Sequence, residues 1–178
     1  MASTWEHPDL GRFEFIRTPP LWAGLLDVPA FSAFTYNSKE PTEQYGLWFY
    51  ADDEDDLPSE AAVAVALKVQ SNQTELVSKI VKALWDDFNG HRSHSGMWWH
   101  GRLQHVRILL LDDEPLAGPR DLLPLLMLDS IAIQKDLHGY DNPIGLLAFR
   151  APFEPEHGVG ILTDGSSVDS IGYFTDFL

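Results

Sequence analysis

The 178-residue chain is long enough to bury one sizeable hydrophobic core, so we expect a single domain over residues 1–178. Its formal net charge of −15 repels phosphate, which disfavours nucleic acid and anionic membranes as partners and is compatible with a basic protein partner. The chain has no Cys, which excludes disulfides, zinc thiolates and thiol nucleophiles. The start of the chain lacks the pattern of a signal peptide and no apolar stretch reaches about 18 residues, so we expect a cytoplasmic protein without a membrane span.

The first fifty residues are predicted to form strands after a loose lead-in at residues 1–9. Three segments show the alternating polarity or the aromatic content that is typical of half-buried strands, namely 11–17, 31–36 and 46–51. The polar segment 37–44 separates the last two and is predicted to be a turn.

An acidic run, DDEDD, follows at residues 52–56. It is compatible with a solvated loop, with carboxylates that complement the positive end of the next helix, or with a cation site. Calcium loops separate their ligands by other residues and carry a Gly at a fixed position, and five consecutive acids lack that spacing. The run therefore favours the first two interpretations.

Two helices are predicted next. Residues 58–70 begin with Pro58 and are rich in Ala, which suits a helix that is apolar nearly all round and largely buried. Asn72 is placed to cap a second helix, with Glu75 three residues later. In this helix, 74–88, the apolar residues fall at helical spacing, and Asp87 falls among the polar ones. Four positions are predicted to be buried: Leu76, Ile80, Leu84 and Phe88. Two adjacent helices of this kind predict a hairpin that covers one face of a sheet.

Residues 89–102 have no periodicity and are predicted to be irregular. This segment and its neighbour carry His91, His94, His100 and His105. Imidazoles that converge on one point bind metals, but these spacings match no established zinc pattern, so a mobile polar loop with incidental histidines is the simpler interpretation. The pair Trp98 and Trp99 either folds back on the sheet or, if exposed, forms a binding surface.

The following segments are shorter. Residues 104–111 suit a strand or a helix end, because periodicity does not decide between them. Residues 121–127 are predicted to be a short helical turn that Pro124 limits. Residues 129–134 alternate, which predicts a strand with Ile131 and Ile133 directed inward.

The clearest structural signal is the Asp164-Gly165 pair in the C-terminal segment 144–174. Asp-Gly suits a two-residue type I′ turn, in which both central residues need a positive φ. Such a turn places Ile161 opposite Val168 and fixes the register of the closing hairpin.

One polar cluster, formed by Glu154, Glu156 and His157, lies at the entrance of that hairpin. Two carboxylates beside an imidazole could perform acid–base chemistry or hold a metal. The same residues could form a structural corner, with His157 bonded to the backbone and Gly158 allowing a close chain approach or a bulge. No nucleotide-binding, hydrolase or metalloprotease motif accompanies them, so we assign no catalytic residue, metal ligand or cofactor.

The segment Ala151-Pro-Phe-Glu-Pro-Glu-His-Gly-Val-Gly-Ile-Leu, followed by Ile171-Gly172, resembles the C-terminus of a group of uncharacterised bacterial domains. In that group an aromatic residue and acidic residues precede Glu-His-Gly, an alternating strand and a closing Ile-Gly. A helix pair introduced by a Pro, here 58–88, is similar too. These domains resemble immunity-type proteins encoded near bacterial toxins, so the resemblance implies a protein-binding role and carries over no catalytic residue.

These observations predict an α+β domain in which an antiparallel sheet has a two-helix hairpin packed on one face. The leading hypothesis for function is a protein-binding domain, immunity-like or antitoxin-like, with a basic protein as its partner. The alternatives are a metal-dependent enzyme that uses His157, Glu154 and Glu156, and a structural or accessory domain. The binding hypothesis takes aromatic anchors from turn-like segments and places the acidic run at the rim. Its candidate binding residues are Trp22, Trp98, Trp99, Glu154, Glu156 and His157.

Overall fold

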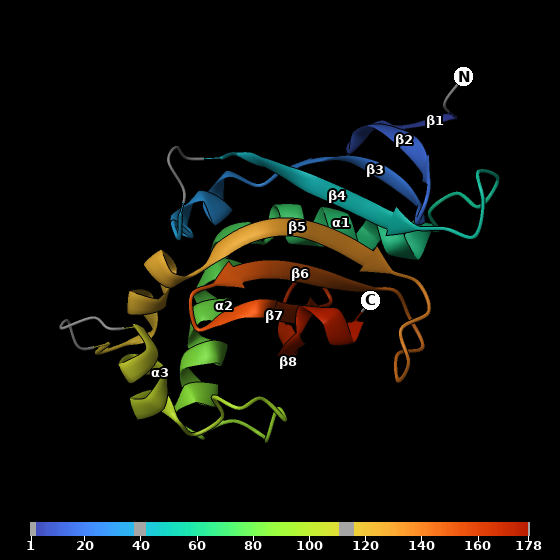
Figure 1. Cartoon of the computed structure of the whole chain (residues 1–178). Coiled ribbons are helices and arrows are strands. Elements are labelled where there is room, and N and C mark those ends of the chain that lie inside the picture. Colours follow the sequence, from blue (N-terminus) through green and yellow to red (C-terminus); the bar gives the residue numbers. More distant parts are fainter. Residues whose placement is uncertain (1–2, 38–41, 111–115, 178) are drawn as a thin grey trace.

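The computed structural model describes residues 3–37, 42–110 and 116–177. Within these residues eight strands form one sheet in the order β1 to β8, and neighbouring strands are antiparallel except for the parallel pair β4–β5. The strands are β1 (Thr4–His7), β2 (Gly11–Arg17), β3 (Pro20–Asp27), β4 (Gln44–Tyr50), β5 (Met127–Gln134), β6 (Ile144–Ala151), β7 (Glu154–Thr163) and β8 (Val168–Tyr173). The fold is an α+β fold with a mostly antiparallel sheet (Figure 1).

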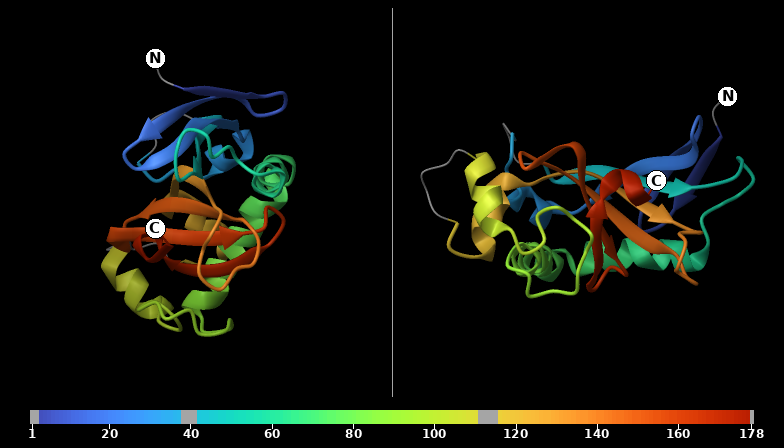
Figure 2. Two further views of the ribbon diagram at one scale, coloured as in Figure 1. Left: turned by 90° about the vertical axis from the view of Figure 1, so that its right-hand side faces the viewer. Right: turned by 60° about the horizontal axis from the view of Figure 1, so that its bottom comes forward.

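The parallel pair requires a long crossover, because a tight turn can join only antiparallel strands. The chain between β4 and β5 supplies it and contains the helices of the fold's middle part: α1 (Glu60–Ser71), α2 (Gln73–Phe88), α3 (Leu103–Leu110) and the 3-10 helix η2 (Pro119–Leu125). Helix α1 packs on β5 and β6, and α2 reaches β8 at the far edge of the sheet (Figures 1 and 2).

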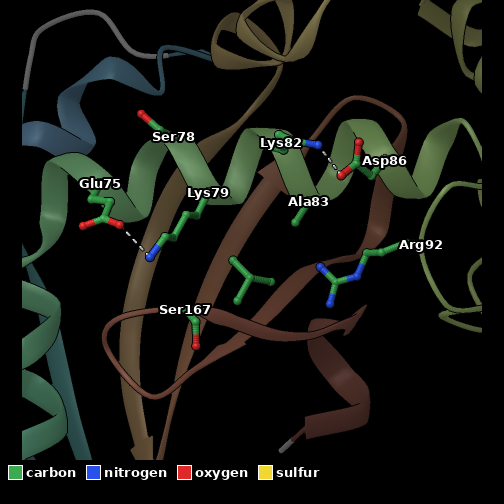
Figure 3. Close-up of a pocket in the computed structure, with 9 residues that line it drawn as sticks. Glu75, Ser78, Lys79, Lys82, Ala83, Asp86, Arg92 and Ser167 are labelled. Carbon is green, nitrogen blue, oxygen red and sulfur yellow. Dashed lines mark hydrogen bonds and ion pairs between the residues drawn. The ribbon is translucent and has the colours of Figure 1, made fainter.

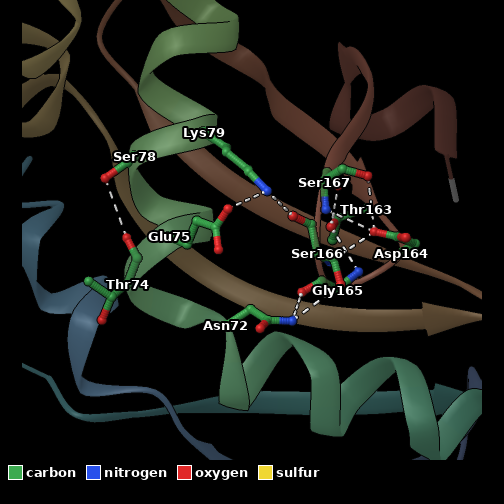
Figure 4. A network of polar contacts seen from close by, with 10 residues as sticks. All are labelled: Asn72, Thr74, Glu75, Ser78, Lys79, Thr163, Asp164, Gly165, Ser166 and Ser167. Carbon is green, nitrogen blue, oxygen red and sulfur yellow. Dashed lines mark hydrogen bonds and ion pairs between the residues drawn. The ribbon is translucent and has the colours of Figure 1, made fainter.

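The structure does not show the predicted antiparallel hairpin of α1 and α2. Asn72 alone joins the two helices, which diverge from this corner (Figure 1). The Asn72 side chain does not cap α2 as the sequence predicted. Its Nδ2 instead donates to the Gly165 carbonyl oxygen at 3.1 Å and to Ser166 Oγ at 3.2 Å (Figure 4). The corner between the helices therefore holds the turn that joins β7 to β8.

The main core lies between the sheet and the helices. The four apolar positions predicted on α2 are all fully buried, which confirms the helical stripe: Leu76, Ile80, Leu84 and Phe88. Burying one such side chain stabilises the fold by about 1.5–3 kcal/mol, so this stripe is a major source of stability. Helix α1 is less buried than predicted, because Ala61 and Ala64 face solvent.

A smaller cluster lies on the opposite face of the sheet and comprises Ala132, Ile144, Leu146 and Leu162. Leu146 belongs to this cluster and Leu147 to the main core, because successive side chains of a strand point to opposite faces. The C-terminal 3-10 helix η3 (Phe174–Phe177) packs Phe174 and Phe177 on the smaller cluster. The central strands are therefore covered on both faces.

The N-terminal region differs from the sequence prediction in three places. Residues 4–7, predicted to be loose, form β1 and pair with β2. Residues 20–27 form β3, which was not among the predicted strands. Residues 31–36 are not a strand, since the 3-10 helix η1 (Pro29–Ala33) occupies their start. Phe31 and Phe34 are both buried there, because a spacing of three places them on one side of a 3-10 turn.

The closing hairpin exists, but its turn and register differ from the prediction. Thr163 pairs with Val168, and Ile161 pairs with Ile171 instead of Val168. The connection is thus a four-residue loop. Asp164 Oδ1 shapes it by accepting bonds from the backbone N–H groups of Ser166 and Ser167, both at 2.8 Å. Gly165 has a φ of 91°, whereas Asp164 is not in the left-handed region, so the loop is not a type I′ turn.

The remaining predictions are largely confirmed. Strand β5 buries Ile131 and Ile133, and η2 is the predicted helical turn. The ambiguous segment 104–111 is the helix α3 up to Leu110, and residue 111 lies outside the described residues. Part of the predicted turn at 37–44, residues 38–41, also lies outside them. In the part of the chain that the structure describes, no helix is long and apolar enough to cross a membrane.

Candidate functional site

Glu154, at the start of β7, is the centre of the cluster that the sequence singled out. Its side chain is buried, with 6% of the residue exposed. Its Oε2 accepts a hydrogen bond from Trp98 Nε1 at 2.9 Å, and its Oε1 lies 3.0 Å from His157 Nδ1. A buried carboxylate needs such partners, because an unpaired charge removed from water is costly. The structure thus brings three predicted residues, Trp98, Glu154 and His157, into contact.

A cleft of about 520 Å³ opens beside this cluster. We call it the acidic cleft and define it by its charged lining, Asp129, Arg150, Glu154, Glu156 and His157, and by its aromatic lining, Tyr36, Phe149 and Phe174. Among the described residues of the lining, three carboxylates face one guanidinium, which gives a formal charge of −2 when His157 is neutral. Arg150 is paired with Asp129 at 2.6 Å, and among the described residues no Lys or Arg forms an ion pair with Glu154 or Glu156.

The imidazole of His157 lies at the mouth of the acidic cleft. Half of its side chain is exposed, and its ring packs against Tyr173 with a centroid distance of 5.2 Å. Gly158 follows with a φ of 65°, and a Cβ there would lie 2.9 Å from the Phe149 carbonyl oxygen. The close chain approach predicted at Gly158 is therefore present. His157, however, bonds to the Glu154 side chain and not to the backbone.

The irregular segment 89–102, which carries His91, His94 and His100, is held in place by Asp87, whose position the sequence predicted wrongly. Asp87 was assigned to the polar side of α2, yet its side chain is fully buried. Its Oδ1 lies 2.7 Å from His100 Nδ1, and its Oδ2 accepts a bond from Ser95 Oγ at 3.0 Å. The spacing in the sequence could have indicated that Asp87 is buried, since position 87 follows Leu84 by three residues and lies on the same face of the helix.

Asp87 fixes the loop to the end of α2 through His100, so this one histidine has a structural role. The Gly101 N–H also donates to the Asp87 backbone oxygen at 2.8 Å, and the His94 ring packs on His100 with centroids 4.9 Å apart. Ser95 bonds to the carboxylate and not to the imidazole, so the order of groups is not that of a nucleophile activated by a base. Among the described residues no group of three or more His, Asp or Glu side chains is placed to hold a metal ion.

Two of the three tryptophans predicted as exposed anchors are buried. Trp22 is 1% exposed and donates from Nε1 to the Asp56 carbonyl oxygen at 2.9 Å, while Trp99 is fully buried. Trp99 packs edge-on against Phe153 and Tyr173, with centroids 5.6 and 5.8 Å away. The expectation that Trp22 and Trp99 lie at the surface was wrong, because both rings pack against other aromatic rings in the core. Trp98 alone stays partly exposed.

The acidic run at 52–56 is a turn on the surface, as the loop interpretation predicted. Asp53 Oδ1 accepts bonds from the N–H groups of Asp55 and Asp56, which stabilises the turn. Lys135 Nζ lies 2.8 Å from Asp52 and 2.6 Å from Asp56. The hydrogen bond from Lys135 lowers the pKa of Asp56, and the bonds from both carboxylates raise the pKa of Lys135. The run thus ties this loop to the end of β5.

The fold and the cleft define an α+β domain with a preformed acidic surface cleft. Residues 30–178 match the family model described as "Domain of unknown function (DUF6985)", and the chain belongs to this family. The match begins after β3, so the first three strands precede the matched residues. The searches for similar curated proteins and for similar solved structures gave no match.

Proposed function

We propose that this chain is a protein-binding domain and that its acidic cleft receives a basic side chain of the partner protein. The observation that carries the proposal is the composition of the cleft, in which the Glu154 and Glu156 carboxylates share the lining with the partly exposed aromatic residues Tyr36 and Phe174. Arg and Lys side chains match such a lining, because their charged heads bind carboxylates and their stems or guanidinium planes pack on aromatic rings.

The fixed position of Glu154 supports this role. Trp98 and His157 hold its carboxylate in place, so a partner would not have to order it on binding. Glu156 is exposed at the mouth and is free to close on an incoming cation. A buried basic anchor of this kind commonly carries much of the binding energy of an interface. The net charge of −15 would steer a basic partner toward the domain and raise its on-rate.

An immunity-type role in the bacterial cytoplasm is the specific form of this proposal. The acidic composition, the Glu154-Pro-Glu-His segment and its resemblance to immunity-type domains support it. The partner would then be a basic toxin-like protein whose gene lies next to that of the immunity protein. Trp22 and Trp99 have no part in this interface, because both are buried. Of the candidate binding residues, Trp98, Glu154, Glu156 and His157 remain.

Co-purification with the product of the neighbouring gene tests the proposal. The expected result is a complex that Glu156→Gln weakens and that Glu6→Gln leaves unchanged, because Glu6 is also an exposed acid but lies on β1, outside the cleft. Added salt should slow association more than it speeds dissociation. Equal binding by both variants would exclude the cleft as the site.

The contact between Glu154 and His157 also suits the alternative of a metal-dependent enzyme. The two hypotheses differ in metal content. For a binder we expect purified protein to lack stoichiometric metal and its melting temperature to be insensitive to a chelator, since only a metal bound to the folded state raises that temperature. Bound zinc, nickel, iron or manganese ligated by His157 would favour the enzyme.

A further inference from the structure

A second surface hollow, whose lining is basic and not acidic, lies between α2 and the start of β8. It encloses about 510 Å³ and has an apolar floor that includes Ala83 and Val168. Three cationic side chains line it, Lys79 and Lys82 from α2 and Arg92 from the loop after α2 (Figure 3). We call it the α2–β8 groove. Among the described residues, the acids in its lining are Glu75 and Asp86, so the formal charge of this lining is +1 on a chain of −15.

Arg92 is the fixed cation of the α2–β8 groove. Its Nη2 donates to the Asp169 backbone oxygen at 3.0 Å, which anchors the guanidinium beside β8. A guanidinium has five N–H donors, and no carboxylate of the described residues lies within ion-pair distance of this one. The Asp169 carboxylate is engaged elsewhere, as it accepts the hydroxyl of Tyr140. Arg92 is thus oriented by a neutral acceptor, and its charge remains available to a ligand.

The two lysines are held along the helix side of the groove. Lys79 Nζ donates to the Ser166 carbonyl oxygen and pairs with Glu75, both at 2.7 Å (Figure 4). Lys82 pairs with Asp86 at 2.6 Å. These i,i+4 pairs are solvent-exposed and therefore weak, so a carboxylate of a ligand can compete for either ammonium group.

We propose that the α2–β8 groove binds an acidic peptide segment in an extended conformation. The length of the groove fits this occupant. From Glu75 to Asp86 the helix rises about 16 Å at 1.5 Å per residue, and about five residues of extended chain at 3.3 Å each span the same length. Alternating side chains would place apolar groups on Ala83 and Val168 and carboxylates near Arg92 and the lysines. The groove is open to solvent along this length, which suits a peptide better than a compact small molecule.

The acidic net charge of the chain does not prevent this binding. At physiological salt the field of a charge decays over about 8 Å, so the cations of the groove dominate what an acidic segment senses on contact. Arg–carboxylate pairs can be bidentate, and such charge-assisted bonds are among the stronger polar contacts. The proposal does not depend on the proposed function, because the acidic cleft shares none of these residues.

Fluorescence anisotropy with a labelled Glu-Val-Glu-Val-Glu peptide tests the proposal. We expect saturable binding to the whole chain, little binding of the neutral Gln-Val-Gln-Val-Gln peptide, and a loss of about tenfold in affinity for Arg92→Gln. Lys82→Gln should also weaken binding, and the variant should fold normally, because the Lys82 side chain is largely exposed and its ion pair with Asp86 is at the surface. Arg12→Gln is the matched control, because Arg12 is an exposed, paired arginine on β2.

Three results would overturn the proposal. These are equal binding of the neutral and acidic peptides, unchanged affinity in both Arg92→Gln and Lys82→Gln, and displacement of the peptide by inorganic phosphate or free glutamate at the same concentration as the unlabelled peptide. The last result would make the groove a site for small anions. None of these outcomes bears on the acidic cleft, which is tested by Glu156→Gln.

Discussion

Replacing Gly165 by Ala is the sharpest test of how the β7–β8 turn sits on α1. Gly165 has a φ of 91°, and its backbone approaches the helix so closely that an added Cβ would collide with it. The nearest atoms would be Lys68 Cβ at 2.5 Å, the Val65 carbonyl oxygen at 2.9 Å and the Val69 nitrogen at 3.0 Å. The last two are backbone atoms inside a helix, so they cannot move aside as the end of a flexible side chain could.

The expected cost has two parts. A left-handed φ costs a residue with a Cβ about 1–2 kcal/mol, and forcing an extra carbon into a packed site typically costs about 1–3 kcal/mol more. Gly165→Ala should therefore lower the free energy of unfolding by about 2–5 kcal/mol. Part of the loss would come from the bonds between the turn and Asn72, because the turn must lift off the helix to make room.

Gly96→Ala is the matched control, because it measures the cost of the left-handed φ without a steric collision. Gly96 has a φ of 83°, but a Cβ there would meet no atom within 4 Å. We expect a loss of only about 1–2 kcal/mol at this site. Urea unfolding followed by tryptophan fluorescence measures both values. If Gly165→Ala were no more destabilising than Gly96→Ala, the turn would not pack against α1 as described.

Three further predictions concern the core, the acidic loop and the cleft. Leu84→Ala should cost about 2–5 kcal/mol in urea unfolding, because Leu84 is fully buried, and a cost near zero would contradict its place in the core. The lowered pKa of Asp56 means that its bond to Lys135 stabilises the fold above about pH 4, the value for an unfolded Asp, and is lost as the pH falls further. The stability gap between wild type and Asp56→Asn should thus be full at neutral pH and shrink below pH 4, and a gap independent of pH would contradict it. Trp98→Phe removes a donor to buried Glu154 and should cost about 1–3 kcal/mol, whereas no loss would mean that water replaces the indole N–H.

The sequence predicted best those elements whose signal is local and periodic. Helix α2 and strand β5 were placed correctly, because their apolar residues recur at the helical and the alternating spacing. Strand β3 does not begin with an alternating pattern, since Leu21 and Trp22 are buried in succession, and it was therefore missed. The segment at 31–36 has the aromatic content of a strand, but its spacing of three belongs to a 3-10 turn.

The turn between β7 and β8 shows why an amino-acid pair alone does not fix a register. Asp-Gly permits a type I′ turn, but two other influences decide the outcome. Asp164 accepts two backbone N–H bonds and Thr163 Oγ1 donates to the Ser167 carbonyl oxygen at 2.6 Å, which favours the wider loop. The corner at Asn72 then binds that loop from 93 residues away in the sequence. Sequence periodicity contains no trace of so distant a contact.

The local contact of the candidate site could be predicted from the sequence, and its distant contact could not. Glu154 and His157 are three residues apart, so their contact is local and the sequence indicated it. The third member, Trp98, lies 56 residues away and was placed as a free anchor. Asp87 was missed although its position on the buried face of α2 was visible, because an acidic residue is rarely fully buried without a partner and that partner, His100, lies in an irregular loop.

The acidic cleft and the α2–β8 groove lie at opposite ends of strand β8, and this separation lets one chain carry two sites of opposite charge. The groove begins at Ser167 and Val168, whereas the cleft is lined by Phe174, just past the other end of the strand. Val168 and Tyr173, the first and last residues of β8, are five steps of about 3.3 Å apart, so the strand is about 17 Å long. This is about twice the distance of 8 Å over which salt screens a charge. The carboxylates of the cleft therefore do not neutralise the cations of the groove, and a basic anchor and an acidic segment can be recognised independently, by one partner that spans the hairpin or by two.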